Sequence, residues 1–383
     1  MSTVKKMTYS KSTKNTCPVF KKHFTDLPDP RRTDKGNYYY SLNEILFLTI
    51  AGIISGMDNW TAICNFGKIK LEWLRNYFPY EYGIPSHDVL GKVFARIEAN
   101  KFNECFINWV NTLSEITKGE VIAIDGKTIR KSNDKRINKC AFHVVSAYAT
   151  ENRLCLGQEC VEQKSNEITA IPKLLELLVV KDCIITIDAM GCQKDIAKKI
   201  IQKQADYVLM VKGNQKILQK DIAATFTTDL PMKASKEHDL GHGRIEIRTC
   251  MVTEDLTLLS NKDKWKGLKS VVKVESERIN KQTGKHSKET RYYISSLAAD
   301  AKHLNTVVRK HWGIENNLHW VLDVIFKEDQ SLKKIGNSAL NFNIMTKAAL
   351  SLIEQETSTK KSKVIKRQSA AMDDKYRAKI LRI

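Results

Sequence analysis

The sequence predicts an α/β fold, in which a mixed β-sheet carries helices on its faces. Three segments with the pattern of strands follow one another at residues 121–125, 141–148 and 154–161. Helical and strand periodicities then alternate as far as residue 211. The resulting order, β-β-β-α-β-α-β, suits a mixed sheet covered by helices.

The chain has 383 residues and so exceeds one ordinary domain of roughly 100–200 residues, which predicts a main body and an accessory region. Residues 1–25 contain six lysines and no acidic residue, so we expect a basic flexible arm. Residues 26–115 predict a helical N-terminal domain, because apolar residues recur there at helical spacing. Within it, Pro85 and Ser86 predict a helix start with Ser86 as the cap.

The predicted α/β domain covers residues 116–356 and has an acid at the end of two strands. The strand that begins at Val121 ends on Asp125, and the strand that begins at Cys183 ends on Asp188. Further segments predict helices at 165–178 and 196–201 and a strand at 206–211. The first of these helices has one apolar face, made of Ile168, Ile171, Leu174, Leu175 and Leu178.

Residues 221–297 predict a β-rich insertion in this domain, with strands at 245–252, 268–275 and 291–296. Helical periodicity returns between residues 300 and 354. Residues 357–383 contain nine basic residues against two acids, which predicts a basic tail that is helical or flexible.

The net charge of +20, from 63 Lys and Arg against 43 Asp and Glu, predicts a polyanionic partner. Nucleic acid is favoured over a membrane surface, because the best apolar segment, Leu46–Met57, is shorter than the roughly 20 residues that span a bilayer. We expect it to be a buried helix. The nine cysteines include no C-x-x-C pair, so neither a zinc knuckle nor a disulfide framework is indicated, and we expect reduced core residues in a cytoplasmic protein.

Asp125 and Asp188 are candidate metal ligands. In an open sheet, ligands gather at the carboxyl ends of strands, and Mg²⁺ prefers carboxylate oxygens. Two such ions about 4 Å apart can cleave a phosphodiester. Taken alone, an Asp at a strand end is more often a cap or a turn residue.

Glu315 is the candidate for a third ligand, because it borders the apolar stripe of a predicted helix. Asp323, Glu328 and Asp329 compete with it, and an acid paired with a surface lysine is the plain alternative. His311, Glu315 and His319 lack the spacing of zinc hydrolases. Trp312 and Trp320 could stack on an extruded base, but their spacing of eight favours core packing.

Several polar residues are candidates for contact with a DNA backbone. Lys127 and Arg130 follow the first acid, and cations beside a metal site suit an anionic substrate. Lys212, Asn214 and Gln215 follow a strand, where a simple turn has the same composition.

Five segments resemble the H-repeat-associated transposases of insertion sequences: Ala123–Arg130, Lys164–Pro172, Thr186–Gln193, Leu209–Gln215 and His311–Asp329. The resemblance implies a ribonuclease H-like fold with Asp125, Asp188 and Glu315 as an Asp-Asp-Glu triad that binds Mg²⁺, or Mn²⁺ as a substitute. It also implies double-stranded DNA as partner, cleavage at the terminal inverted repeats, transfer of the 3′-hydroxyl into target DNA, and a homo-oligomer on DNA.

One feature departs from related insertion-sequence transposases, which carry Tyr, Arg and Lys around this Glu. Here Val308, His311 and Leu322 occupy those places, so we expect phosphate contacts from residues such as Arg309 and His311. Two other functions stay open: a DNA-binding remnant without activity, and a metal-dependent nuclease that cleaves but does not join.

Overall fold

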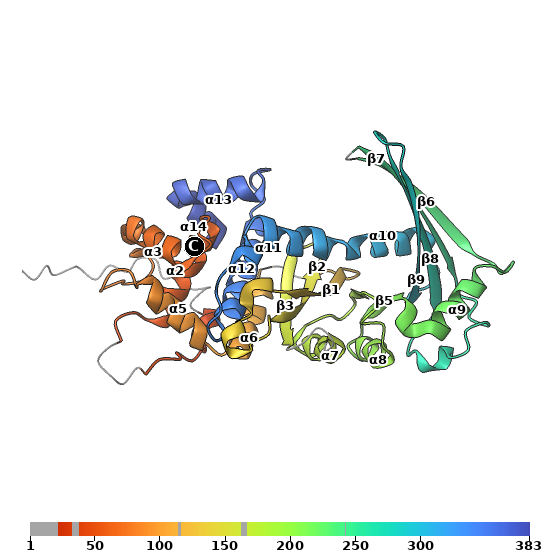
Figure 1. The fold of residues 1–383 in the computed structure, drawn as a ribbon, viewed down its shortest axis with the longest axis horizontal. Helices are drawn as coiled ribbons and strands as arrows, with labels where there is room; N and C mark the ends of the chain where they lie inside the picture. Colours follow the sequence, from red (N-terminus) through yellow and green to blue (C-terminus); the bar gives the residue numbers. More distant parts are fainter. Residues whose placement is uncertain (1–21, 33–37, 114–115, 162–166, 242) are drawn as a thin grey trace, which may run out of the picture. The chain divides into compact units, whose positions relative to one another are not determined.

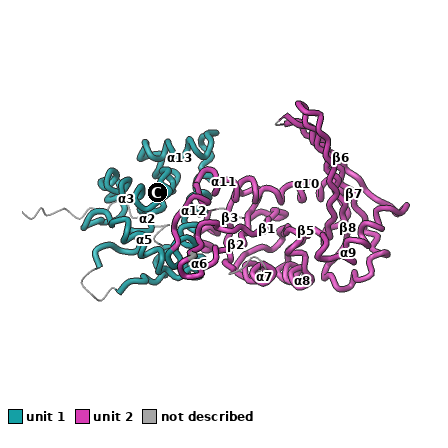
Figure 2. Tube along the Cα trace, in the orientation of Figure 1, with its two compact units in different colours: residues 1–105, 335–383 teal, residues 106–334 magenta. Residues whose placement is uncertain are grey.

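The structure is a computed structural model that describes residues 22–32, 38–113, 116–161, 167–241 and 243–383. The chain forms two compact units, residues 1–105 with 335–383 and residues 106–334 (Figure 2). This division differs from the expected one, because the C-terminal segment joins the N-terminal helices. Most of the expected basic arm, residues 1–21, lies outside the described residues.

The first unit is helical, as the sequence predicts. Ser41 caps the apolar helix α2 in a capping box with Glu44, and Ser86 caps α5 through the backbone N–H of Val89, as predicted. The predicted buried helix at Leu46 is confirmed, because twelve of the thirteen residues of α2 are buried. Its helices are α2 (Leu42–Ile54), α3 (Trp60–Ile69), α4 (Leu71–Leu74), α5 (His87–Arg96), α6 (Ala99–Val110, which runs into the second unit), α12 (Ser338–Gln355), α13 (Lys363–Met372) and α14 (Asp374–Leu381).

The basic C-terminal segment is part of this helical core. The guanidinium of Arg377 is fully buried, 3.9 Å from the centre of the Trp73 ring, and pairs with Asp374. Arg367 donates to the carbonyl of Ile53 and pairs with Asp58. A run of basic residues predicts a solvated surface, but here two of the arginines fix α13 and α14 against their neighbours.

The second unit contains a nine-stranded sheet in the order β3-β2-β1-β4-β5-β9-β8-β7-β6 (Figure 1). β1 pairs antiparallel with β2, and β2 with β3, whereas β1, β4 and β5 are parallel. The predicted mixed sheet is therefore confirmed. The strands are β1 (Val121–Thr128), β2 (His143–Ala149), β3 (Leu154–Val161), β4 (Ile184–Ile187), β5 (Asp206–Val211), β6 (Lys233–Gly241), β7 (Arg244–Thr253), β8 (Ser270–Asn280) and β9 (His286–Ser295).

The β-rich insertion continues the central sheet. β9 pairs antiparallel with β5, with Val208 opposite Ser295, and β8, β7 and β6 follow in order. β6 was not expected as a strand, because its sequence is polar and lacks the β-branched residues that mark strands. Helix α9 (Lys216–Thr225) precedes it.

Helices cover both faces of the sheet. α7 (Glu167–Leu177) and α8 (Lys194–Gln202) lie on one side, and α10 (Ala301–His311) lies on the other (Figure 1). α10 buries Leu304, Val307 and Val308 against strands of the central sheet and of the insertion. Its C-terminal end leads into a π-helical turn, Glu315–His319, and then α11 (Trp320–Val324). Among the residues described, no helix has the length and apolar character to cross a bilayer.

Candidate active site

Asp125 and Asp188 lie next to each other at the edge of the sheet. The parallel register of β1 and β4 pairs Ile124 with Ile187, and each acid is the next residue along its strand. The backbone N–H of Gly126 donates to Asp125 Oδ1 over 2.9 Å, and that of Met190 donates to Asp188 Oδ1 over 3.0 Å. Strand pairing therefore brings together two acids that are far apart in the sequence.

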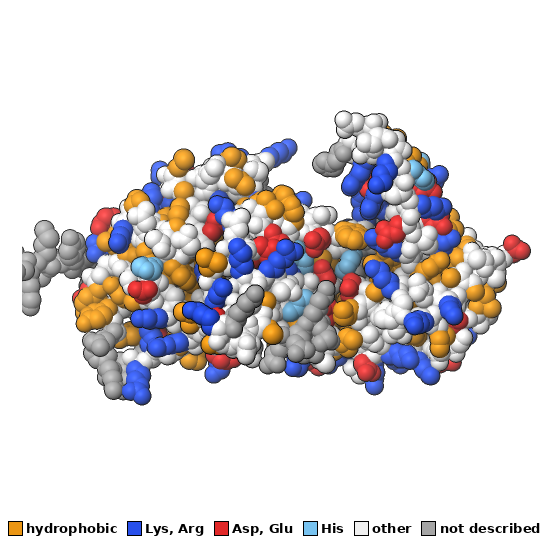
Figure 3. Space-filling view, viewed as in Figure 1, with side chains coloured by type: hydrophobic (Ala, Val, Ile, Leu, Met, Phe, Trp, Pro, Cys, Tyr) orange, Lys and Arg blue, Asp and Glu red, His pale blue; other side chains and the backbone are white. Residues whose placement is uncertain are grey.

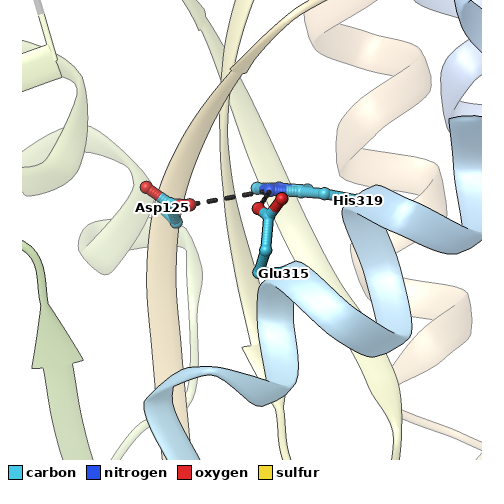
Figure 4. Close-up of side chains that lie close together, drawn as sticks. All are labelled: Asp125, Glu315 and His319. Carbon is cyan, nitrogen blue, oxygen red and sulfur yellow. Dashed lines mark hydrogen bonds and ion pairs between the residues drawn. The ribbon is translucent and has the colours of Figure 1, made fainter. Parts of the chain in front are cut away.

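Glu315 approaches Asp125 from the helix above this edge. Figure 4 shows Glu315 and His319 on one helical turn, with their side chains directed toward Asp125. His319 Nδ1 lies 3.1 Å from Glu315 Oε2 and 3.6 Å from Asp125 Oδ2. Ligand atoms of Asp125, Glu315 and His319 lie within 4.8 Å of one another, which is close enough to share one ion.

The turn that carries Glu315 is a π-helix, which is typical of functional sites. The backbone N–H of Trp320 donates to the carbonyl of Glu315, five residues earlier. On this turn the side chains of Glu315 and His319, four residues apart, lie together while Leu318 is buried. A regular helical pattern in the sequence does not reveal such a turn.

The electrostatics of the site favour a bound cation. Burial raises the pKa of Asp125 to about 6, and the nearby charges of Asp188 and Glu167 also raise it. His319 and the backbone N–H of Gly126 act in the opposite direction. Burial also raises the pKa of Asp188, opposed by the N–H of Gly191 and by Lys212. A hydrogen bond with His319 lowers the pKa of Glu315. Adjacent carboxylates that resist ionisation are stabilised when a metal ion shares their charge.

The acids that compete with Glu315 are already paired with cations. Lys127 Nζ lies 2.5 Å from Asp323 and also pairs with Glu328. Arg130 Nε lies 3.4 Å from Asp329. These three acids are absent from the group formed by Asp125, Glu315 and His319, and the ammonium of Lys127 lies in ion pairs within the protein.

Two of the expected DNA contacts instead support the loop after Asp188. Asn214 Nδ2 donates to the carbonyl of Ala189 over 2.6 Å, and Gln215 Nε2 donates to that of Cys192 over 3.0 Å. The neighbouring Lys212 is exposed and lowers the pKa of Asp188 through its charge. Lys212 thus keeps the position expected of a phosphate contact.

The residues near Glu315, where related transposases carry Tyr, Arg and Lys, lie in different environments. His311 Nδ1 lies 3.0 Å from Thr186 Oγ1, and burial lowers the pKa of His311 to about 4, so its ring is neutral at pH 7. Arg309 pairs with Asp239 at the surface. The expected core packing of Trp312 and Trp320 is wrong, because they are 40% and 53% exposed. The π-helical turn changes the helical phase between them.

A buried hydrogen-bonded pair, His143 with Glu167, was not expected from the sequence. His143 Nε2 lies 2.5 Å from Glu167 Oε1, and His143 Nδ1 lies 2.9 Å from Thr128 Oγ1. A side chain at Gly126 would collide with this pair. Glu167 falls within one of the quoted segments, but no spacing rule links it to a histidine on a neighbouring strand.

Comparison with known proteins gives two families in succession along the chain. Residues 21–110 match the family described as DDE_Tnp_1-associated, and residues 116–352 match the transposase DDE domain. A DDE transposase domain implies a ribonuclease H-like fold, so the predicted fold class is confirmed.

The chain is also similar to curated proteins over most of its length. It is 42% identical to "Putative transposase YncI" of Escherichia coli O157:H7, over 93% of this chain and 92% of that protein. It is 41% identical to "H repeat-associated putative transposase YhhI" of Escherichia coli K12, over 94% and 96%. A shorter protein of that strain, "Inactive transposase YbfQ", is 38% identical over 19% of this chain and 86% of its own length. The chain therefore belongs to the DDE transposase family, in the group of the H repeat-associated transposases.

Proposed function

We propose that this transposase cleaves DNA at the ends of its own element and joins the freed 3′-hydroxyl to target DNA, with Asp125, Asp188 and Glu315 as catalytic residues. The observation that carries the proposal is the approach of Glu315 to Asp125, with His319 between them. The register of β1 and β4 supports Asp188 as the neighbouring acid, although the group whose ligand atoms lie within 4.8 Å of one another consists of Asp125, Glu315 and His319. Partly buried acids that repel one another are a candidate site for a cation.

The donor set fits divalent magnesium, with manganese as a substitute. The carboxylates of Asp125, Asp188 and Glu315 are the oxygen donors that these ions prefer. When bound, the ions supply an activated nucleophile and stabilise the leaving oxygen. The chain's own contribution is to hold the acids in place: backbone N–H groups orient Asp125 and Asp188, and His319 orients Glu315.

Arg130, Lys212 and Arg309 are the predicted contacts that remain accessible to a DNA backbone. We assign Lys127, Asn214, Gln215 and His311 to support of the site, because their polar groups bond within the protein. The substrates would be double-stranded terminal inverted repeats and target DNA. We expect a homo-oligomer on DNA, because two element ends must be brought together.

The test uses the purified chain and a duplex that contains an element end, in Mg²⁺ and in EDTA. Asp125→Asn, Asp188→Asn and Glu315→Gln should each reduce cleavage at least about 10³-fold while the affinity for DNA is kept, because these ligands act only on the reacting phosphate. Asp263→Asn, which removes an exposed acid, is the matched control and should cut normally.

Each alternative function has its own result in this assay. Cleavage that persists in any of the three acid variants would refute the assignment of that residue. Products of cutting without strand-transfer products would identify a nuclease, and wild-type protein that binds but never nicks would identify an inactive DNA binder.

A further inference from the structure

A pocket of about 590 Å³ lies beside α10 in the second unit. Strands β7, β8 and β9 of the insertion form one wall, and α10 with the start of the π-helical turn forms the other. Asn316 and Asn317, which follow Glu315 in the chain, also line it. The pocket therefore adjoins the turn that carries Glu315.

The wall of this pocket is strongly basic. Its lining contains a single carboxylate, that of Glu246, and six cationic side chains: Arg244, Arg248, Arg278, Arg291, Arg309 and Lys310. Figure 3 shows Lys and Arg side chains gathered on the insertion strands at this side of the molecule. We call these six residues the basic groove.

Three arginines of the basic groove share one acid. Glu246 lies 3.8 Å from Arg244, 2.9 Å from Arg248 and 3.5 Å from Arg278. Glu237 of β6 lies opposite Arg248 in the strand register, so two carboxylates stand against these three guanidinium groups. In addition, Nη1 of Arg248 is buried and has no hydrogen-bond partner among the described residues. Converging guanidinium groups that lack counter-charges are typical of a site for an anion.

The other cations of the basic groove have partners at its rim. Arg291 pairs with Glu289 over 2.8 Å, Arg309 pairs with Asp239, and Lys310 pairs with Glu151. Each of these three acids is about half exposed, so a phosphate can replace them at little cost. The groove keeps an excess of positive charge even with these partners in place.

On the opposite face of the same strands, two lysines are paired with glutamates. Lys273 lies 2.8 Å from Glu275, and Lys288 lies 3.0 Å from Glu275 and 3.4 Å from Glu277. Because successive side chains of a strand point to opposite faces, Arg278 and Lys273 belong to different sides of β8. What distinguishes the face that meets α10 is therefore the gathering of its cations around one pocket.

An aromatic ring adds a second kind of contact. Trp312 lines the pocket, is 40% exposed, and has the guanidinium of Arg291 4.7 Å from its ring centre. Indole and guanidinium planes of this kind stack on nucleobases as well as on each other. An inorganic anion could not stack on this ring, whereas a nucleotide could.

We propose that the basic groove binds the sugar–phosphate backbone of the DNA strand that leads into the catalytic acids. This inference rests on the proposed function and names the surface that holds its substrate. Arginines of β7 and β8 contact successive phosphates, and Trp312 contacts a base or sugar beside the cleavage point. The insertion thus serves as a wall that aligns the strand with Asp125 and Glu315.

The test compares two double variants with equal changes of charge. Arg244→Gln with Arg278→Gln removes two half-exposed guanidinium groups of the groove and leaves Glu246 paired with Arg248. Lys273→Gln with Lys288→Gln removes two charges from the opposite face of the same strands. Circular dichroism melts show that both proteins are folded before binding is measured.

Fluorescence anisotropy with an end-containing duplex gives the dissociation constant at several salt concentrations. The groove variant should bind at least about 10-fold more weakly at low salt, and its slope of log affinity against log salt should fall by about two. The opposite-face variant should change little. Equal losses in both variants would overturn the proposal, because the effect would then be one of net charge.

A further protein separates this proposal from the proposed function. Asp125→Asn should bind DNA like the wild type, because the groove is intact in it. If the wild type never cuts, but the groove variant alone loses affinity, the DNA-binding role of the groove is supported and the proposed catalytic function is refuted. If the wild type cuts and the groove variant binds normally, the groove fails and the function stands.

Discussion

Nδ1 of His319 lies 3.1 Å from Oε2 of Glu315, four residues earlier on the same π-helical turn. The imidazole is 4% exposed and also lies 3.6 Å from Asp125. It therefore contacts two of the three acids of the candidate metal site, Asp125 and Glu315.

His319→Ala should weaken metal binding and cleavage by about 10-fold to 100-fold, the range found when a side chain that orients a ligand is removed. Isothermal titration with Mn²⁺ measures the first effect without any reaction, and the nicking assay measures the second. His303→Ala removes an exposed histidine of α10 and serves as the control. Normal Mn²⁺ affinity in His319→Ala would show that the imidazole has no part in the site.

The raised pKa of Asp125 predicts how stability changes with pH in the absence of metal. The folded-state pKa is about 6, against a usual value of 3.8, so the native state holds this proton more tightly than the unfolded state. Stability then falls as the pH rises from about 4 to about 6, and the cost is fully present above that range. Its upper limit is about 3 kcal/mol for a shift of this size.

Asp125→Asn removes this cost, because the amide does not ionise. In EDTA at pH 8 the variant should therefore be more stable than the wild type, and the difference should disappear toward pH 4. Urea unfolding at several pH values measures it, and the variant-minus-wild-type difference cancels other titrating groups. Addition of Mg²⁺ should stabilise the wild type alone. A constant difference across this pH range would contradict the pKa assignment.

The central sheet and two of the acids could be predicted from the sequence because local patterns determine them. Val121 to Ile124 is a continuous apolar run and Cys183 to Ile187 is apolar except for Thr186, which favours buried strands, and an acid directly follows each run. That β1 and β4 are neighbours is also a common outcome for strands joined by a helical crossover. The place of Asp125 beside Asp188 follows from these two facts.

The third acid, the exposure of Trp312 and the burial of Arg377 depend on contacts between residues far apart or on a local turn that no sequence pattern encodes. The choice between Glu315 and its rivals depends on Lys127, which pairs with Asp323 and Glu328 across a long sequence separation. The exposure of Trp312 depends on a π-helical turn that the sequence does not mark. Burial of Arg377 against Trp73 requires a packed partner from the other end of the chain.

Lys127→Met tests whether this lysine supports the fold of the site. The ammonium is largely buried and pairs with Asp323 and Glu328, so its loss removes a cation from beside two carboxylates. We expect a loss of about 3 kcal/mol in the free energy of unfolding, the lower end for a broken buried pair. Urea unfolding measures it.

A second substitution separates this effect from loss of a DNA contact. Adding Glu328→Gln to Lys127→Met removes the charge of one carboxylate that faced Lys127, and should restore part of the stability. If Lys127→Met unfolds like the wild type but loses affinity for DNA, the ammonium is a phosphate contact and its ion pairs are not structural.

Gly126→Ala should disturb the acid beside it by way of the buried pair behind the strand. A Cβ at this position would lie 2.5 Å from His143 Nε2 and closer still to Glu167 Oε1, so either the pair or the end of β1 must move. Because Asp125 is the adjacent residue, we expect cleavage to fall about 10²-fold, the effect of roughly 1 Å of misplacement, with a lower melting temperature. Gly213→Ala is the matched control, since a Cβ there meets no atom within 4 Å. Single-turnover nicking rates at saturating DNA distinguish the outcomes: a Gly126→Ala protein that cuts like the wild type would show that the His143 and Glu167 pair yields without moving Asp125.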